Sequence, residues 1–249
     1  MKSDLDNLRV VLVATRNPLN IGAGARAMSN FGARHLRLVH PYEVAFREAR
    51  SAVGAAELMA SAKEYATVAE AVADCRLVVG TTAAGRRELQ HELRQLEQGG
   101  RTIRNQLGAR RVALLFGSEK VGLSNEDMSH CHWLIRIPTR AEHGSMNLGQ
   151  AVAICLYELV RSGKTAAVKN GKEHAAAADL ERLTQVLFEV LDRSGYVKPR
   201  VAAATEAKLR RMVRRMNLSD GDAELWLGML RQIQWKLGAP ESRPGPKED

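Results

Sequence analysis

The sequence contains no apolar run of the roughly 18 to 20 residues that a membrane-spanning helix needs. It also lacks the basic start and apolar stretch of a secretory signal, because Asp4 and Asp6 lie within the first ten residues. The 249 residues have the composition of a globular protein, with 45% hydrophobic and 26% charged residues. We therefore expect a soluble cytoplasmic protein that has no membrane partner.

Cysteine is scarce, and the three cysteines cannot all pair as disulfides. Cys75, Cys131 and Cys155 each lie among apolar neighbours, and the sequence has no CxxC motif or close Cys/His cluster that would suggest a metal site. We predict buried thiols in a reducing compartment and no bound metal.

Acidic residues are too few to balance the basic ones. The chain has 28 Asp and Glu against 37 Lys and Arg, which gives a formal charge of +9. Of these, 17 basic and 12 acidic residues follow residue 160, so the last third of the chain is the more basic part for its length. Such an excess suits a polyanionic partner, although scattered solvated side chains give many proteins the same charge. Charge alone therefore does not identify the partner.

Five short apolar runs recur over the first 160 residues, at 8–14, 36–40, 75–81, 111–117 and 132–138. Runs of this length that are rich in Val, Leu and Ile, without strict alternation, are typical of strands buried on both faces of a parallel sheet. Helical patterns lie between and after these runs, at 20–31, 67–73, 101–108 and 147–162. The alternation predicts an α/β fold with an open, mostly parallel sheet.

The character of the sequence changes after Arg161. Residues 163–178 are rich in Gly, Lys, Asn and Ala and have no consistent apolar face, which indicates a linker. Helical periodicity returns at Asp179 and predicts three helices, whereas three prolines near the end indicate a disordered tail. We therefore divide the chain into a domain of residues 1–162, the linker 163–178, a three-helix extension of residues 179–238 and the tail 239–249.

The segment NIGAGARAMSNFG, residues 20–32, nearly matches the dinucleotide fingerprint G-x-G-x-x-G/A, with Gly22 and Gly24 as the first two glycines. However, seven residues separate the strand from Gly22, too many for the tight turn of that motif. The next strand ends at His40 and Pro41 without the ribose-binding acid. An NAD-dependent dehydrogenase is therefore the less favoured alternative.

Two later loops also have the composition of a ligand site. Residues 114–126, LLFGSEKVGLSNE, place two glycines and a glutamate directly after a buried strand, at the sheet edge where α/β folds bind ligands. Residues 135–159 leave the last strand and enter a helix through Ser145 and Asn147, where free backbone N–H groups converge. His143 lies in the same loop without a paired Ser, Cys or acid, so we leave it out of the site.

Three separated motifs together resemble those of a known family. They are N-x-G-x-x-x-R at Asn20, Gly22 and Arg26, on a helix that Asn20 is expected to cap, then FGSEKVGL at 116–123, and Ile137-Pro138 followed by SMNL at 145–148. In this order and spacing they resemble the motifs of the SpoU (TrmH-like) branch of the SPOUT RNA methyltransferases, over residues 8–160. The helical sequence after Asp179 is similar to the C-terminal extension of the bacterial TrmJ-type tRNA ribose methyltransferases in that family.

The resemblance implies a parallel α/β sheet whose C-terminal part forms a deep trefoil knot, among the few exceptions to the rule against knots. It implies S-adenosylmethionine as the cofactor, S-adenosylhomocysteine as its product, and a homodimer whose subunits share the active site. The arginine that many relatives have in a GTSAR segment is displaced here to Arg86 or Arg87. By position, the cofactor loops contain Thr81, Thr82, Ala83, Gly117, Ile137, Gly144, Ser145 and Met146.

The implied reaction is methylation of a ribose 2′-hydroxyl in RNA, at nucleotide 32 of the tRNA anticodon loop, a cytidine or uridine; DNA is not expected as a partner. Arg26 is assigned to the target nucleotide, either to hold its phosphate and favour the alkoxide or to act as the general base. The residues expected to position Arg26 and the ribose are Asn20, Glu119, Ser145 and Asn147. The basic side chains of the extension expected to bind RNA are Lys208, Arg210, Arg211, Arg214 and Arg215.

Two other functions stay open on the sequence: methylation of ribosomal RNA by the same chemistry, and RNA binding without catalysis. The basic helix also has a plainer interpretation as a solvated surface. Intact Arg26, Glu119 and Asn147 favour an active enzyme, and the extension favours tRNA, in both cases through the resemblance alone.

Overall fold

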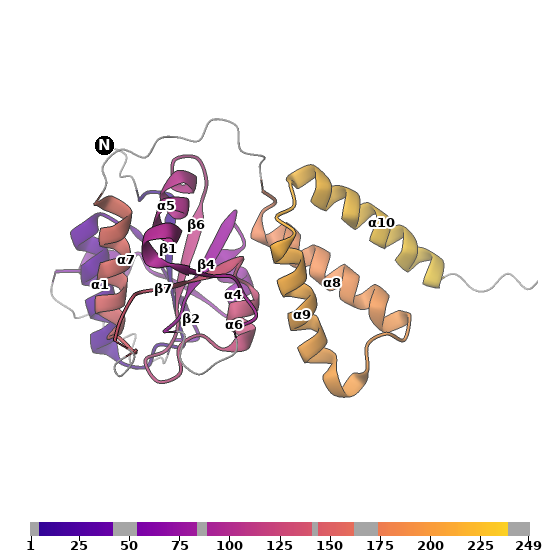
Figure 1. Cartoon of the computed structure of the whole chain (residues 1–249), viewed down its shortest axis with the longest axis horizontal. Helices are drawn as coiled ribbons and strands as arrows, with labels where there is room; N and C mark the ends of the chain where they lie inside the picture. The colour runs from indigo at the N-terminus through magenta and orange to yellow at the C-terminus, as the bar shows by residue number, and fades with distance from the viewer. Residues whose placement is uncertain (1–4, 42–53, 84–88, 141–143, 162–173, 239–249) are drawn as a thin grey trace, which may run out of the picture.

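The computed structural model describes residues 5–41, 54–83, 89–140, 144–161 and 174–238. The strands of these residues form one seven-stranded sheet in the order β3-β2-β1-β6-β4-β7-β5, and all the pairings are parallel (Figure 1). The strands are Leu8–Val13 (β1), His35–Val39 (β2), Lys63–Tyr65 (β3), Leu77–Thr81 (β4), Leu93–Gln95 (β5), Val112–Phe116 (β6) and Trp133–Arg136 (β7).

The five strands predicted from the apolar runs are confirmed as β1, β2, β4, β6 and β7. Strands β1 and β6 are buried along their whole length, as expected for the centre of a parallel sheet. The sequence did not predict β3 and β5, which have three residues each and lie at the two edges of the sheet. Both are largely exposed and polar, so they leave no apolar run to detect.

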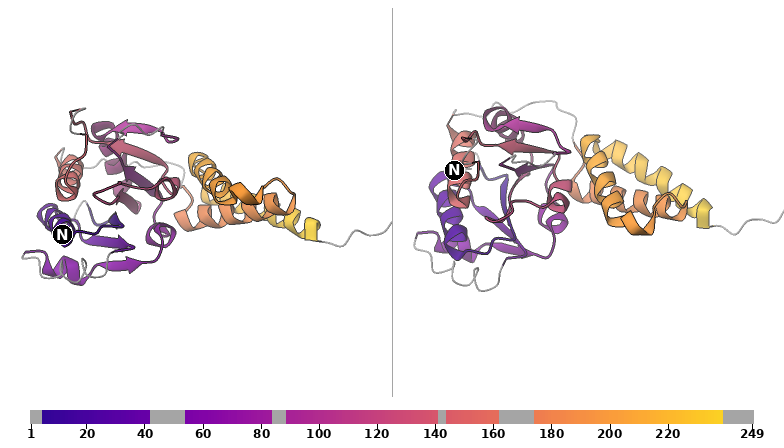
Figure 2. Two further views of the ribbon diagram at one scale, coloured as in Figure 1. Left: turned by 90° about the horizontal axis from the view of Figure 1, so that it is seen from below. Right: turned by 60° about the horizontal axis from the view of Figure 1, so that its bottom comes forward.

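Helices cover both faces of the sheet, and three more lie beside it (Figure 2). Helices α1, α3, α5 and α7 contribute to the buried cluster on one face, and α4 and α6 contribute to the cluster on the other. The helices are Pro18–Phe31 (α1), Ala56–Ala60 (α3), Val68–Val72 (α4), Leu96–Leu107 (α5), Asn125–Ser129 (α6), Leu148–Val160 (α7), Ala177–Arg193 (α8), Ala202–Arg215 (α9) and Asp220–Gly238 (α10), with a 3-10 turn at Pro199–Val201.

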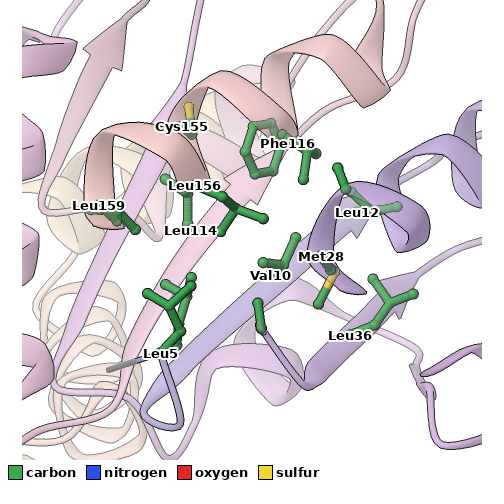
Figure 3. Packing of buried hydrophobic residues seen from close by; sticks show 14 of the residues in the cluster. Leu5, Val10, Leu12, Met28, Leu36, Leu114, Phe116, Cys155, Leu156 and Leu159 are labelled. Atoms are coloured by element: carbon green, nitrogen blue, oxygen red, sulfur yellow. The ribbon is translucent and has the colours of Figure 1, made fainter. Parts of the chain in front are cut away.

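The core follows from the two-residue period of the strands. Along β1, Val10 and Leu12 point to the α1 and α7 side, whereas Val11 and Val13 belong to the cluster on the opposite face. Figure 3 shows the first cluster, where side chains of β1 and β6 meet those of α1 and α7, including Phe116. This packing fixes the sheet between its helices and brings α7 against α1.

Helix α1 begins three residues earlier than expected. Asn17 is the N-cap, since its side chain accepts the Leu19 N–H at 2.9 Å, and Pro18 occupies the first helical position. Asn20, which the sequence suggested as the cap, lies inside the first turn. Because Asn17 caps the helix, the side-chain oxygen and nitrogen of Asn20 are both available to bond to other residues.

The three C-terminal helices pack around a core of their own, which includes Leu183, Val213 and Leu227. Helix α8 begins at Ala177, inside the segment predicted as a linker, and the N–H groups of Ala177 and Ala178 donate to carbonyls next to α4. The three helices extend away from the sheet as an arm (Figures 1 and 2). Residues 162–173 of the predicted linker and the predicted tail 239–249 lie outside the described residues.

The three cysteines are buried and unpaired, as predicted. Burial raises the pKa of each thiol to about 12, so Cys75, Cys131 and Cys155 are neutral at physiological pH. No helix among the described residues is long and apolar enough to cross a bilayer.

Asp74, just after α4, gathers positive side chains from three segments of the sheet. Arg37 of β2 donates two hydrogen bonds to its carboxylate, and Arg111 donates a third at 3.2 Å. The hydrogen bonds from Arg37 hold the pKa of the Asp74 carboxyl well below its usual range. Arg9 adds a longer contact at 4.0 Å. One carboxylate therefore ties α4 to the sheet.

We expect the substitution Asp74→Asn to destabilise the protein by about 1–2 kcal/mol at pH 7, a modest value because a third of this side chain is exposed. The folded-state pKa is depressed, so the contribution is complete above the unfolded value of about 4 and is lost as pH falls below it. Urea unfolding at pH 7 and pH 3.5 measures this. Glu97→Gln, which removes an exposed pair with Arg101, is the control and should change stability by less than about 0.5 kcal/mol. Equal stability of Asp74→Asn and the unaltered protein at pH 7 would contradict the assignment.

Candidate active site

Three loops at the carboxyl edge of the sheet enclose a cavity of about 360 Å³. They follow β4, β6 and β7, whose carboxyl ends meet at one edge because the strands are parallel. The volume lies in the range of roughly 300–1,000 Å³ typical of small-molecule sites. The structure brings all the predicted cofactor-loop residues together in its wall: Thr81, Thr82, Ala83, Gly117, Ile137, Gly144, Ser145 and Met146.

The loop after β6 folds back on itself at the floor of this cavity. Ser118 pairs with Gly122 as an isolated bridge, and the Gly122 N–H donates to the Ser118 carbonyl at 2.8 Å. A Cβ at Gly117 would lie 2.0 Å from the Gly122 carbonyl carbon and 2.1 Å from the Leu123 nitrogen. Gly122 itself has φ +70°, a conformation that favours glycine. The two glycines of FGSEKVGL are thus required by two different constraints, close backbone approach and a left-handed turn.

A chain of hydrogen bonds joins the three sequence motifs. The Asn147 amide nitrogen donates to the Asn20 side-chain oxygen at 2.8 Å, and the Asn20 amide nitrogen donates to the Glu119 carboxylate at 2.9 Å. The Asn147 oxygen meanwhile accepts the Gly149 N–H and caps α7. Asn147 and Asn20 are 127 positions apart in the sequence, and Asn20 and Glu119 are 99 apart, but the hydrogen bonds fix all three next to one another. Ser145 lines the adjoining cavity.

A second cavity, of about 680 Å³, lies on the other side of residues 118–121, which line both cavities. Its remaining wall comes from the connection between β1 and α1 and includes Arg16, Asn17 and Asn20. Ala14 turns the chain there with φ 52°, a left-handed conformation that is uncommon outside glycine and concentrates at functional sites. Arg16 and Asn17 were not predicted from the sequence as site residues. The unusual length of this connection was the available signal for them, but it counted only against the dinucleotide motif.

The dinucleotide alternative does not fit the structure. Gly22 and Gly24 are buried within α1 and do not form a strand-to-helix turn. Gly24 faces Leu12 of β1 and Val152 of α7, so its small size serves helix packing.

Arg26 is not part of either cavity in a single chain. It is exposed on α1, and it has no hydrogen bond or ion pair with the described part of the molecule. It shares one exposed stripe of the helix with Leu19, Ala23 and Asn30, at the spacing of successive turns. The structure thus assembles Asn20, Glu119, Ser145 and Asn147 but leaves Arg26 pointing outward.

Three of the predicted RNA-binding arginines are buried, and two of them, Arg210 and Arg214, bond to other residues of the chain, which corrects the prediction for these two. Arg210 of α9 bonds to the carboxylates of Glu126, Glu181 and Glu206 at 2.7 to 3.1 Å. Arg214 is 1% exposed and donates to the Ala177 carbonyl, and burial lowers its pKa to about 10. The reason is that α9 packs against α6 and α8, so both side chains hold the extension in place.

The other basic residues of α9 have different surroundings. Lys208 and Arg215 are exposed, whereas Arg211 is largely buried and has no carboxylate bonded to it among the described residues. His143, Arg86 and Arg87 lie outside the described residues.

Comparison with known proteins gives consistent similarities. The family model of the SpoU rRNA Methylase family matches residues 7–157. Two relatives named tRNA (cytidine/uridine-2′-O-)-methyltransferase TrmJ are each 36% identical: that of Sodalis glossinidius over 92% of both chains, and that of Yersinia pestis over 97% of this chain and 96% of the relative. The crystal structure of TrmJ from Z. mobilis has a TM-score of 0.80 and 31% identity, covering 91% of this chain and 98% of that chain.

We expect Gly117→Ala to cost about 2–3 kcal/mol of stability, because its methyl group would force the loop of residues 118–123 away from the cavity floor. Gly122→Ala is the matched control: its Cβ meets no atom within 4 Å, so only the left-handed backbone strain of about 1 kcal/mol remains. Chemical denaturation measures both variants. A Gly117→Ala protein as stable as Gly122→Ala would show that the backbone does not pass as closely as described.

Proposed function

Because this chain belongs to the SpoU rRNA methylase family, we propose that it is an S-adenosylmethionine-dependent RNA methyltransferase acting on the ribose 2′-hydroxyl of cytidine or uridine in tRNA. The observation that carries the proposal is the hydrogen-bonded chain Asn147–Asn20–Glu119, which stands between two cavities that can take a cofactor and a nucleotide. The tRNA substrate rests on the names of the relatives, which match 92% and 97% of this chain.

The first cavity fits S-adenosylmethionine in size and chemistry. Apolar walls from Phe116, Ile137 and Leu148 suit a flat base, and the hydroxyls of Thr81, Thr82, Thr139 and Ser145 suit ribose and amino-acid groups. A Cβ at Gly144 would project toward the Ala83 carbonyl, 4.0 Å away, and would fill space between the two cofactor loops. When bound, the cofactor supplies an electrophilic methyl group on sulfur.

The chain's own residues supply alignment and charge. The second cavity receives the target nucleotide, with Arg16 beside its phosphate. Asn20 of the second cavity and Ser145 of the first orient the ribose, and Asn147 holds the Asn20 amide in place. Glu119 accepts from Asn20 and has carboxylate capacity left to pair with an arginine fork.

We assign Arg26 to the active site of a partner subunit. Its stripe on α1 continues into an exposed apolar face formed by Leu19, Ile154 and Tyr157 of α1 and α7. Burying these side chains in a homodimer would carry Arg26 across the interface toward the partner's Glu119 and bound nucleotide. There its guanidinium holds the phosphate and stabilises the alkoxide. The general chemistry of the guanidinium group, a donor without an acceptor atom, disfavours a role as general base.

We further propose that the loops of the site form a deep trefoil knot. The chain runs from β6, next to β1, to β7 on the far side of β4, and then returns to pack α7 on α1. The close passage at Gly117 supports threading, because the backbone there leaves no room for a side chain.

The extension of residues 179–238 is proposed to help hold the tRNA, so that residues 1–162 act on nucleotide 32 of the anticodon loop in the cytoplasm. Lys208 and Arg215 remain its candidate RNA contacts because both are exposed on α9. The alternative is that both side chains belong to a solvated surface that does not contact RNA.

The proposal predicts that the purified protein, with methyl-labelled S-adenosylmethionine and a tRNA transcript, forms 2′-O-methylcytidine or 2′-O-methyluridine at position 32. Mass analysis of nuclease-digested tRNA measures it. Arg26→Ala should lower the rate at least a hundredfold, about 2.7 kcal/mol of barrier, while leaving the melting temperature and cofactor binding unchanged. Methylation of ribosomal RNA but not of tRNA would contradict the proposed substrate. A product methylated on the base would contradict the proposed reaction.

Mixed dimers show whether Arg26 acts in the active site of its own subunit or in that of the partner subunit. Neither Arg26→Ala nor Asn20→Ala alone should be active, but mixing them gives dimers in which one site has both side chains. If Arg26 acts across the interface, about a quarter of the normal activity should return, because half of the random dimers are mixed and each has one complete site. No recovery would place Arg26 in its own subunit's site.

A further inference from the structure

A third cavity, of about 240 Å³, lies where the extension meets the sheet domain. Helix α9 contributes Lys208 and Arg211, the segment before β5 contributes His91, and α6 contributes Asn125 and Met128. Met128 also lines the first cavity, so this side chain separates the two. Figure 1 shows α6 and α9 on the side of the sheet opposite α1 and α7, so a dimer formed through α1 and α7 would leave this cavity open.

Arg211 is the unusual member of this cavity. It is only 9% exposed, and no described residue accepts a hydrogen bond from it or forms an ion pair with it. No Arg211 nitrogen is among the buried atoms that lack a hydrogen-bond partner, so its guanidinium faces the cavity and not the interior. A largely buried arginine is normally given a counter-charge. Glu126 lies near enough to influence its charge, but that carboxylate is hydrogen-bonded to Arg210 at 2.7 Å. Glu126 is therefore committed to Arg210, and no carboxylate of the described residues bonds to Arg211.

His91 supports the same interpretation. Its Nε2 atom is buried and has no hydrogen-bond partner. Burial, together with the positive charges of Arg211 and Arg215, lowers the pKa of His91 to about 4. The positive charge of the cavity therefore comes from Arg211 and Lys208, with a neutral imidazole beside them.

We propose that this cavity binds a backbone phosphate of the substrate RNA, with Arg211 as its main ligand and Lys208 and His91 beside it. The inference rests on the proposed function for its ligand. A phosphate accepts two parallel hydrogen bonds from a guanidinium, and the cavity is smaller than the usual small-molecule site, which suits a phosphate on a strand crossing its mouth better than a whole free nucleotide. Its position one side chain from the first cavity places that strand next to the proposed cofactor site.

Arg214 shows why burial alone does not make such a site. It is even more buried, but it donates to the Ala177 carbonyl, lies 3.6 Å from Glu181 and lines none of the three cavities described here. No ligand from solution can reach it, whereas Arg211 forms part of an open wall.

The test compares Arg211→Met with Arg231→Met in the full-length protein. Both remove one positive charge from the extension, but Arg231 is exposed on α10 and outside the cavity. Equilibrium binding of tRNA, without cofactor and over a range of salt, should weaken about tenfold for Arg211→Met, with the slope of log K against log salt reduced by about 0.9. Arg231→Met should change affinity less than about twofold. Equal losses in the two variants would overturn the proposal.

The melting temperature distinguishes a ligand role from a structural one. Arg211→Met should melt at or above the temperature of the unaltered protein, because the replaced guanidinium has no partner; a clear decrease would mean that Arg211 supports the fold instead. Lys208→Met, at an exposed position, is the second variant and should weaken tRNA binding about threefold with no change in melting. Unchanged binding in both cavity variants would refute the site.

Inorganic phosphate and cytidine monophosphate separate the sources of the phosphate group. Neither should raise the melting temperature at micromolar concentration; if either does so in the unaltered protein but not in Arg211→Met, the cavity is a site for a free anion and not for an RNA strand. Because binding is measured without methyl transfer, a protein that binds tRNA through Arg211 but methylates nothing would refute the proposed function and leave this site standing.

Discussion

One side-chain amide, that of Asn147, is the contact on which the arrangement of the site depends. Its oxygen caps α7, and its nitrogen donates to Asn20, which in turn donates to Glu119. Asparagine suits this position because its amide offers an acceptor to α7 and, on a separate atom, a donor to the first turn of α1. The start of α7, the first turn of α1 and the loop after β6 are therefore set relative to one another, and the walls of both cavities follow from them.

The basic side chains of the chain have two different roles, and the composition alone does not show which side chain has which role. Arg37, Arg210 and Arg214 are buried and bond to carboxylates or carbonyls, although Nε and Nη1 of Arg214 have no partner among the described residues. They join helices to the sheet and the extension to the domain. Arg26 and Arg211 have no such partners among the described residues and are the ones we connect with RNA. The net charge of +9 thus overstates the number of groups available to a polyanion.

Sequence patterns predicted the features that depend on local interactions. Apolar runs predicted the buried strands, and the family resemblance implied the loops that line the first cavity, which lie together because parallel strands bring their carboxyl ends to one edge. Asn20 was misassigned because Asn17, followed by Pro18, is the stronger start signal and was not weighed against it. The burial of Arg210 could not be predicted, since its partners Glu126 and Glu181 come from α6 and α8, 84 and 29 residues away, and meet it only through tertiary packing. The same packing creates the cavity around Arg211.

The substitution Asn147→Asp tests the central role of this amide most directly. Aspartate caps a helix about as well as asparagine, so α7 and the melting temperature should be preserved. It cannot donate to Asn20, and if the Asn20 amide turns over to donate instead, its oxygen faces the Glu119 carboxylate. We predict that methyl transfer to tRNA in a single turnover falls at least tenfold, about 1.4 kcal/mol, with cofactor affinity retained. A full rate in a stably folded Asn147→Asp protein would contradict the account.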